Sequence, residues 1–200
     1  MTTTRHLPFP APIGTLRASA TTEGIVGLWF TDGVTDGSSR ASDPVPPSAS
    51  IPPPDRDLAA DPAALHHLER LEAELNAYLE GRLHRFTVPL RPSGSPFQRQ
   101  VWEALLTVPY GRTCSYAALT EQLGFPSTSA RALGQANGQN PIAILIPCHR
   151  VVQRGGGLGG YGGGLERKAW LLAHERLHAP QDDGPKDPAE TWSGQLRLGM

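Results

Sequence analysis

The chain has 200 residues, of which 38% are hydrophobic, so it can bury a core, although 22 glycines and 20 prolines favour irregular structure in part of its length. A formal net charge of −1 excludes an overall polycation or polyanion, and two cysteines exclude a disulfide framework. No apolar run reaches the roughly 18 residues that a membrane span needs, and the first residues lack an apolar signal sequence. We therefore expect a cytoplasmic protein that does not contact membranes.

The charge is unevenly distributed along the chain. From Pro96 to Arg176 there are eight Lys or Arg residues, four Glu and no Asp, so this stretch is basic within a chain of nearly zero net charge. A basic half joined to an acidic half suggests a polyanionic partner. Ordinary scatter in composition explains the charge pattern equally well.

Residues 1–92 are predicted to form a small N-terminal domain with an antiparallel sheet and one helix. Residues 13–30 have the pattern of a β-hairpin, with an alternating stretch, a Thr-Thr-Glu-Gly turn and an apolar run. Residues 34–57 are dense in Pro and Ser and poor in large apolar residues, which predicts a disordered loop.

A helix is predicted to begin at Asp61. The aspartate can act as an N-cap, and Pro62 fits the first helical position. The helix ends at Gly81, and its apolar stripe consists of Leu65, Leu68, Leu71, Leu75 and Leu79. Residues 86–90 are then predicted to form a short strand that leads to a linker at residues 91–94.

Residues 93–178 are predicted to form a mostly helical second domain, followed by a flexible tail at residues 179–200. Ser95 and Gln98 form a capping box around Pro96. The buried face of this first helix is expected to contain Phe97, Val101 and Leu105.

Two short helices follow, separated by a turn that contains Gly124. Ser115 can cap a helix through Leu123, and Ser127 can cap a second helix that runs to about Gly138. The pair has the shape of a helix-turn-helix. Many helix pairs of this shape occur in proteins that do not bind DNA, so the motif alone leaves DNA binding open.

The end of the second domain combines a buried run, a glycine-rich stretch and a final helix. Residues 142–146 are apolar and should be buried, while residues 155–164 are rich in glycine, which either lets backbone lie close to a flat ligand or forms a flexible surface loop. No Gly-Lys-Ser/Thr follows the glycines, so no nucleotide phosphate is expected there. Residues 166–177 predict a helix that packs through Ala169, Leu172, Ala173 and Leu177.

Cys148 stands between the buried run and His149. Thiolate is the reactive form of cysteine, so reactivity needs a base or a positive neighbour, and His149 and Arg150 are both adjacent. Neighbours on an extended segment point apart, so a turn or a water molecule would have to connect the thiol to the imidazole. Glu175 could orient the imidazole from the last helix. An inert buried cysteine is the alternative. Cys114 and the seven histidines show no metal-ligand spacing, so we expect no metal.

Several motifs of the second domain occur in the order and at nearly the spacing of one known family. They are Pro96-Phe-Gln-Arg-Gln-Val-Trp-Glu-Ala-Leu105, Val108-Pro-Tyr-Gly111, Ser115-Tyr116, Ala130-Arg131-Ala132, Asn140-Pro141, Pro147-Cys-His-Arg-Val-Val152 and Gly164-Leu-Glu-Arg-Lys-Ala-Trp-Leu-Leu-Ala-His-Glu175. The set resembles the O6-alkylguanine-DNA alkyltransferases, or methylated-DNA–protein-cysteine methyltransferases. Residues 1–92 resemble the family only weakly.

The resemblance implies an α+β fold, with a ribonuclease H-like N-terminal domain and a C-terminal domain that contains a winged-helix-like helix-turn-helix. It implies DNA repair by direct reversal, in which the alkyl group of O6-alkylguanine, or less readily of O4-alkylthymine, moves irreversibly to Cys148. Each molecule would act once, without cofactor or metal. The expected partner is double-stranded DNA, bound through its minor groove by a monomer, with cooperative assembly on DNA left open.

The resemblance also implies roles for single residues. Cys148 would be the nucleophile, and His149, a bridging water and Glu175 would form its proton relay. Tyr116 would donate to N3 of a guanine flipped out of the duplex, and Arg131 would fill the vacated place in the base stack.

Further residues would bind the DNA or the flipped base. Small side chains at Ala130 and Ala132 would allow close approach to DNA, Asn140 would brace the cysteine loop, and Lys168 would assist the tyrosine. The backbone of Val151, Tyr161 and Gly162 would read the guanine edge, and Leu158 would line the alkyl pocket. Family members often carry Ser where Gly162 stands, and a backbone contact should tolerate that change.

Three other functions remain as alternatives. A non-catalytic protein could recognise alkylated guanine, but such relatives typically lack the cysteine. A cysteine hydrolase would use Cys148 and His149 and would leave the helix pair and Arg131 unexplained. A transcriptional regulator could use the helix pair, but the sequence offers no obvious dimerisation surface.

Overall fold

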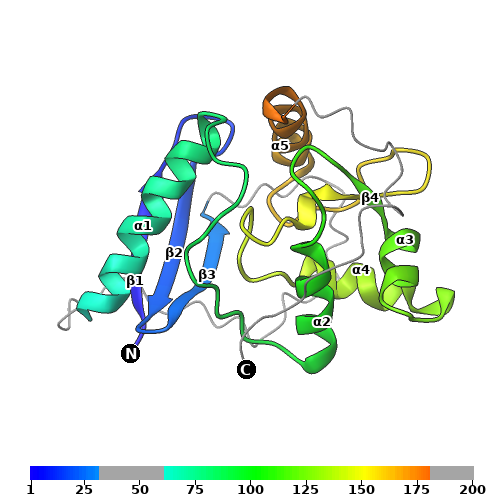
Figure 1. The fold of residues 1–200 in the computed structure, drawn as a ribbon, viewed down its shortest axis with the longest axis horizontal. Coiled ribbons are helices and arrows are strands. Elements are labelled where there is room, and N and C mark those ends of the chain that lie inside the picture. Colours follow the sequence, from blue (N-terminus) through cyan, green and yellow to red (C-terminus); the bar gives the residue numbers. More distant parts are fainter. Residues whose placement is uncertain (32–60, 181–200) are drawn as a thin grey trace.

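The computed structural model describes residues 1–31 and 61–180 (Figure 1). The predicted loop at residues 34–57 and the predicted tail beyond residue 180 lie outside the described residues. A small antiparallel sheet and a long helix form one side of the molecule in Figure 1, and shorter helices form the other. The expected mixture of α and β structure is confirmed at this level.

The sheet consists of β1 (Thr3–Pro8), β2 (Thr15–Thr21) and β3 (Gly24–Phe30), paired antiparallel in that order. The predicted hairpin corresponds to β2 and β3. The edge strand β1 was not predicted, because Leu7 is its single buried residue and the segment lacks the alternation of apolar and polar residues that marks a half-buried strand.

Helix α1 (Pro62–Leu79) covers one face of this sheet (Figure 1). It begins as predicted, since the Asp61 carboxylate accepts a hydrogen bond from the backbone N–H of Ala63 at 2.9 Å. The face that it buries consists of Ala64, Leu68, Leu71, Leu75 and Tyr78. The prediction for Leu65 was wrong: this side chain lies one position round the helix from the buried face and is 36% exposed.

The prediction of a strand at residues 86–90 was also wrong. Only an isolated bridge between Ile25 and Leu90 is present there. The Glu74 carboxylate of α1 accepts the backbone N–H groups of Thr87 (2.7 Å) and Val88 (3.1 Å), and the next residue is a proline, which has no N–H. Three consecutive residues therefore have no donor left for a strand ladder.

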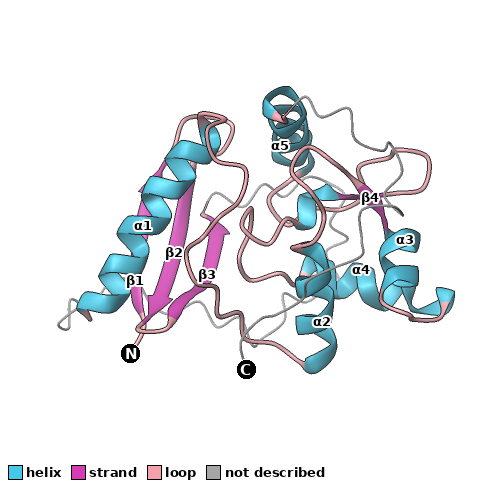
Figure 2. Ribbon diagram, in the orientation of Figure 1, coloured by secondary structure: helices cyan, strands magenta, loops and turns pink. Residues whose placement is uncertain are grey.

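The second half of the molecule is mostly helical (Figure 2). Its elements are α2 (Pro96–Leu105), β4 (Cys114–Ser115), α3 (Tyr116–Gln122), the 3₁₀ turn η1 (Ser127–Ser129), α4 (Ala130–Gly138), the 3₁₀ turn η2 (Cys148–Arg150), β5 (Val151–Val152) and α5 (Leu165–His178). The two short strands β4 and β5 pair in parallel.

Three serines were predicted as N-caps in this half, and two of these predictions are confirmed. The capping box of Ser95 and Gln98 is formed, and the Ser115 hydroxyl accepts the backbone N–H of Ala118 at 3.1 Å. Ser127, predicted as an N-cap, instead begins η1, where the Ser129 N–H bonds the Pro126 carbonyl at 2.8 Å. The chain turns too tightly there for an α-helix, and α4 begins three residues later.

The run at residues 142–146 joins the two halves. As predicted it is largely buried, and it meets the edge of the sheet at β3: the Leu28 N–H bonds Pro141 O at 2.9 Å, and the Ala143 N–H bonds Leu28 O at 3.0 Å. Buried residues of the two halves belong to one hydrophobic cluster. This segment, which leads directly to Cys148, is therefore attached at its start to the edge of the N-terminal sheet.

The packing face predicted for the last helix was wrong. Ala169 and Ala173 are exposed, Leu177 is 79% exposed, and Leu172 is half-buried. The buried face of α5 is Arg167, Lys168, Leu171, His174 and Glu175. Four polar side chains can face inward because each finds a hydrogen-bond partner there.

Candidate active site around Cys148

Cys148 lies in the η2 turn, directly after the buried run. Its side chain is buried, with 7% of the residue exposed. Asn140, which follows α4, donates from Nδ2 to the Cys148 Sγ at 3.1 Å and to Ile146 O at 2.8 Å, and its Oδ1 accepts the Ile142 N–H at 3.0 Å. These bonds connect Asn140 to the backbone of the cysteine loop and to the sulfur itself.

The protonation states at this turn follow from burial. Burial raises the pKa of the Cys148 thiol, against the hydrogen bond from Asn140 and the nearby Lys168 ammonium, which lower it. Burial lowers the pKa of His149, against the hydrogen bond and charge of Glu175. The resting pair is therefore a thiol next to a neutral imidazole, which is able to accept a proton.

His149 is oriented by Glu175 of α5. The His149 Nε2 and Glu175 Oε1 lie 2.8 Å apart, and both side chains are fully buried. The other ring nitrogen, Nδ1, is buried and has no hydrogen-bond partner among residues 1–31 and 61–180. Cys148 and His149 both lie in the η2 turn and not on an extended segment.

The Glu175 carboxylate is surrounded by donors. Burial raises its pKa, but the hydrogen bond and charge of His149, and then those of Arg150, hold the pKa well below its usual range. Its partners are His149 Nε2, the Arg150 Nε (2.8 Å) and Nη2 (3.0 Å), the Tyr78 hydroxyl (2.8 Å) and the Gly111 N–H (3.2 Å). The carboxylate stays ionised, so it can stabilise a protonated His149.

Tyr116 begins α3 and is half-buried beside the thiol. Burial raises the pKa of its hydroxyl, and the proximity of Cys148 raises it further, while a hydrogen bond from Asn137 lowers it. The tyrosine therefore remains a proton donor at neutral pH. Asn137 is buried in α4, and sequence analysis did not identify it.

Lys168 connects β5 to the glycine-rich stretch. Its Nζ donates to Val151 O at 2.7 Å and to Gly160 O at 3.4 Å. Burial lowers the pKa of this fully buried ammonium to about 8, against the neighbouring Cys148 and Cys114 thiols, which raise it. Val151 is buried, and its carbonyl is already engaged by the lysine.

The glycine-rich stretch lies against the tyrosine and the histidine. A Cβ at Gly159 would be 3.5 Å from the Tyr116 hydroxyl. The Tyr161 ring packs edge-on against His149, with centroids 6.3 Å apart. Leu158 is half-buried, and Gly162 is exposed with open space where a side chain would begin.

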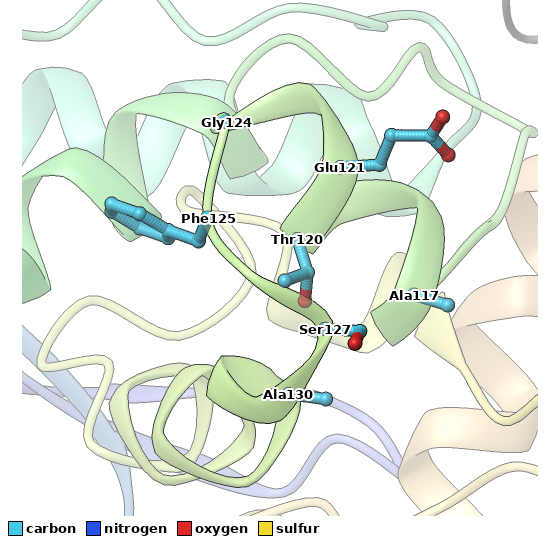
Figure 3. A pocket seen from close by; sticks show the side chains of 7 residues that line it. All are labelled: Ala117, Thr120, Glu121, Gly124, Phe125, Ser127 and Ala130. Carbon is cyan, nitrogen blue, oxygen red and sulfur yellow. The ribbon is translucent and has the colours of Figure 1, made fainter.

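The residues expected to meet DNA lie at the start of α4. Arg131 and Ala132 are exposed at the start of α4, and Ala130 is half-buried. Ala130 borders a hollow of about 470 Å³ between α3 and α4, shown in Figure 3, which Ala117, Thr120, Glu121, Gly124, Phe125 and Ser127 also line. The structure thus brings Cys148, His149, Glu175, Tyr116, Asn140, Val151, Tyr161 and Lys168 together and leaves Arg131 at the surface.

Two residues that contact the site, Tyr78 and Asn137, were missed from the sequence, and the contact that a third residue makes was not predicted. Arg150 lies inside the cysteine motif, but its bidentate contact with Glu175 depends on α5. Tyr78 occupies a buried position of α1, where its hydroxyl requires a partner, and this requirement was the available signal. Asn137 gave no signal in an ordinary helix pattern.

Two classes of feature are absent from the part of the chain that the structure describes. No group of three His, Cys, Asp or Glu side chains is placed to hold a metal ion. No helix there combines the length and apolar character required to cross a membrane.

The second half of the chain is similar to one family of known proteins. Residues 96–177 match the family model described as "6-O-methylguanine DNA methyltransferase, DNA binding domain". A methylated-DNA–protein-cysteine methyltransferase of Mycolicibacterium paratuberculosis is 57% identical over 107 residues, and one of Shigella flexneri is 51% identical over 106 residues. These matches cover 54% and 52% of this chain but only 64% and 61% of the two relatives, less than two thirds of their length.

Solved structures match over more of the chain. The O6-methylguanine methyltransferase of Mycobacterium tuberculosis is 36% identical, with a TM-score of 0.67, over 91% of this chain and 97% of that one. A second structure from that organism, titled as a complex with DNA, is 39% identical, with the same TM-score, over 88% of this chain and 95% of the other.

Proposed function

The chain belongs to the O6-methylguanine-DNA methyltransferase family, and we propose that it repairs DNA by transferring the alkyl group of O6-alkylguanine to Cys148. The observation that carries the proposal is the buried thiol beside a neutral His149 whose far nitrogen is held by an ionised Glu175. An inert structural cysteine would not need this pair. The named relatives, which are methylated-DNA–protein-cysteine methyltransferases, support the same activity.

The reaction begins with activation of the thiol. His149 Nδ1, through a bridging water, takes the Cys148 proton, and Glu175 stabilises the imidazolium that results. Nε2 is already bound to Glu175, whereas Nδ1 has no hydrogen-bond partner among the described residues, which supports this direction of transfer. Asn140 donates to the sulfur and so stabilises the thiolate.

The thiolate then attacks the alkyl carbon in line with the carbon–O6 bond. A sulfur–carbon bond forms as the carbon–oxygen bond breaks, and the electron pair passes to the guanine. Tyr116 gives a proton or hydrogen bond to N3 of the leaving base. The proton that His149 took from Cys148 balances the negative charge that the attack leaves on the base. The products are a thioether on Cys148 and an unmodified guanine.

DNA recognition is the second part of the proposal. The O6 atom lies inside the base pair, so the nucleotide must be flipped out of the stack. The exposed Arg131 fills the vacant place, while Ala130 and Ala132 allow α4 close approach in the minor groove. In this scheme the regions 1–92 and 93–178 are a ribonuclease H-like domain and a winged-helix-like domain, and a monomer binds the duplex.

The base pocket follows from the same scheme. The backbone of Val151, Tyr161 and Gly162 reads the guanine edge, Leu158 borders the alkyl group, and Lys168 holds Val151 in place through its carbonyl. A thioether is not hydrolysed under mild conditions, and the site offers no group to remove the alkyl. Each molecule therefore acts once, with O4-alkylthymine as a poorer substrate.

The test is one incubation with a duplex that carries a single O6-methylguanine, followed by peptide mass spectrometry. We expect one methyl group on the peptide that contains Cys148, at up to one per protein, and none in Cys148→Ser. Cys148→Ser should still fold, because serine is nearly isosteric. Tight binding of the duplex with unmodified Cys148 would instead identify a non-catalytic protein that recognises alkylated guanine.

A further inference from the structure

The Glu175 carboxylate is reached by a side chain from the N-terminal half. Tyr78, near the end of α1, is fully buried, and its hydroxyl donates to Glu175 Oε1 at 2.8 Å. The same oxygen is 2.8 Å from His149 Nε2. The tyrosine and the histidine therefore share one acceptor atom, although 71 positions separate them in the chain.

The tyrosine ring is fixed on several sides. It packs against Phe86 (centroids 5.2 Å apart), Tyr110 (5.9 Å, edge-on) and His174 (5.5 Å). The His174 Nε2 also bonds the Tyr78 carbonyl at 2.8 Å, which ties the end of α1 to α5. A ring held in this way keeps its hydroxyl oxygen 2.8 Å from Glu175 Oε1, so this contact is a fixed feature of the site.

The other groups around His149 and Glu175 differ from Tyr78 in their charge or in the carboxylate oxygen that they contact. Arg150 donates to both carboxylate oxygens, and Gly111 donates to Oε2. Arg150 and Lys168 act on His149 as nearby positive charges. Tyr78 is thus the neutral donor that competes with His149 for Oε1.

The remaining titratable neighbours make no such contact. The Tyr110 hydroxyl is buried and has no hydrogen-bond partner within the described ranges, and the same is true of the Tyr161 hydroxyl. His174 faces the Tyr78 ring and carbonyl, and its ring bonds that carbonyl rather than Glu175. Cys148 is the group that the relay serves.

We propose that Tyr78 is a positioning residue of the Cys148 relay that acts through Glu175: its hydroxyl draws negative charge away from the carboxylate oxygen that His149 binds. This role rests on the proposed alkyl transfer, since that is the reaction the relay serves. It gives the N-terminal half a part in the chemistry, through one hydroxyl group.

The proposal predicts the sign of a change in pH dependence. Without the hydroxyl, Oε1 carries more negative charge and stabilises a protonated His149, so the pKa of His149 rises. A protonated imidazole cannot take the Cys148 proton. The acidic limb of the rate profile, where His149 becomes protonated, should therefore move to higher pH when the hydroxyl is removed.

The experiment compares Tyr78→Phe with Tyr110→Phe, which loses the same hydroxyl in the adjacent ring but no hydrogen bond. The single-turnover rate of methyl transfer from an O6-methylguanine duplex is measured between about pH 5 and 9. We expect wild type and Tyr110→Phe to share one acidic midpoint. We expect Tyr78→Phe to have a midpoint higher by roughly 0.3 to 1 pH unit, which lowers the rate at pH 7 by up to about threefold.

A third protein tests the opposite direction and preserves both the ring and the hydroxyl. Replacement of Tyr78 by 3,5-difluorotyrosine makes the hydroxyl a stronger donor, so the acidic midpoint should move to lower pH. This variant keeps the proposal testable even if Tyr78→Phe does not fold.

The failures are distinguishable. Absence of methyl transfer in the wild type would remove the proposed function itself. Active transfer with one midpoint in every variant, and rate losses that follow thermal stability, would reduce Tyr78 to a structural contact. An equal shift in Tyr110→Phe would assign the effect to loss of any nearby hydroxyl, and would also overturn the proposal.

Discussion

Helices α1 and α5 both pack into the interior, but they bury opposite kinds of side chain. The buried face of α1 is apolar apart from one tyrosine hydroxyl. The buried face of α5 contains Arg167, Lys168, His174 and Glu175, with Leu171 as its single apolar member. The two helices meet where Tyr78 contacts Glu175 and His174.

The difference shows how two rules select a helix face. For α1 the hydrophobic effect decides, and a periodic row of leucines marks the inward side. For α5 the available hydrogen-bond partners select the inward face. Arg167, for example, donates to the carbonyls of Pro12, Ile13 and Gly163, and its guanidinium lies over the Phe30 ring. Buried charge adds little net stability even when it is paired, so the inward face of α5 is set by the available hydrogen-bond partners and not by hydrophobicity.

The largest effect is expected where α5 carries the relay, in Glu175→Gln. We expect alkyl transfer to slow by roughly 100-fold or more and the free energy of unfolding to fall by about 3–5 kcal/mol, because Arg150 loses its buried partner. Single-turnover rates and urea unfolding measure the two. Glu166→Gln, on the exposed side of the same helix, should change stability by less than about 1 kcal/mol.

The same pair of proteins gives a test in pH. The folded-state pKa of Glu175 lies below its usual 4.5, so its contribution to stability is complete above that pH and is lost as the pH falls through the folded value. The stability gap between wild type and Glu175→Gln should therefore be full at neutral pH and narrow below about pH 4.5. A gap that stays constant into acid would contradict the ionised carboxylate.

Leu71→Ala tests the apolar helix. Removing this fully buried side chain from α1 should lower the free energy of unfolding by about 2–5 kcal/mol. The transfer rate, measured where the variant is folded, should change by less than about threefold, because Leu71 lies seven residues before Tyr78 in α1 and makes no hydrogen bond through its side chain. The exposed Leu65→Ala is the matched control, with an expected loss below about 1 kcal/mol.

Lys168→Met sharpens the contrast, since it turns a charged position of α5 into an apolar one of similar length. We expect stability at neutral pH to stay unchanged or rise by up to about 2 kcal/mol, because a buried ammonium is removed, while transfer slows about tenfold as Val151 O loses its donor. The pKa of Lys168 is about 8 in the folded protein and 10.5 in the unfolded chain. The destabilisation that the buried ammonium causes in the wild type is therefore full below about pH 8 and disappears as the pH rises to about 10.5. Urea unfolding at several pH values should show the advantage of the variant shrinking over that window.

Arg131→Ala concerns an exposed charge and should leave stability within about 0.5 kcal/mol. Transfer from duplex DNA should fall far more than transfer from free O6-benzylguanine, because only the duplex needs its base stack refilled. Parallel rate measurements with the two substrates decide this. Equal losses on both would count against the role in base flipping.

The smallest effect is expected for Gly162→Ser. Nothing lies within 4 Å of the position where its Cβ would be placed. Stability should change by less than about 0.5 kcal/mol and the transfer rate by less than about twofold, since only backbone contacts are proposed there. A large rate loss, measured on the duplex, would mean that the added side chain enters the base pocket.

Much of the site could be predicted because its motif is local. Cys148, His149 and Arg150 are consecutive, and the motif set that led to them also contained Tyr116, Asn140, Lys168 and Glu175. The hydrogen bond from Asn140 to the Cys148 sulfur could not be predicted, because it depends on how the segment between them turns. Tyr78 was missed because its partner lies 97 residues away.

The sequence by itself determined the helix starts at Asp61, Ser95 and Ser115, the hairpin, and the residues of the reactive motif. Caps and turns involve atoms within three or four residues of each other, so the local chain is sufficient. Only the tertiary structure decided which face of α5 turns inward, where β1 pairs, and how Glu175 receives donors from three distant segments. Those outcomes depend on partners brought together by folding, and a buried charge is stable only where such partners are present.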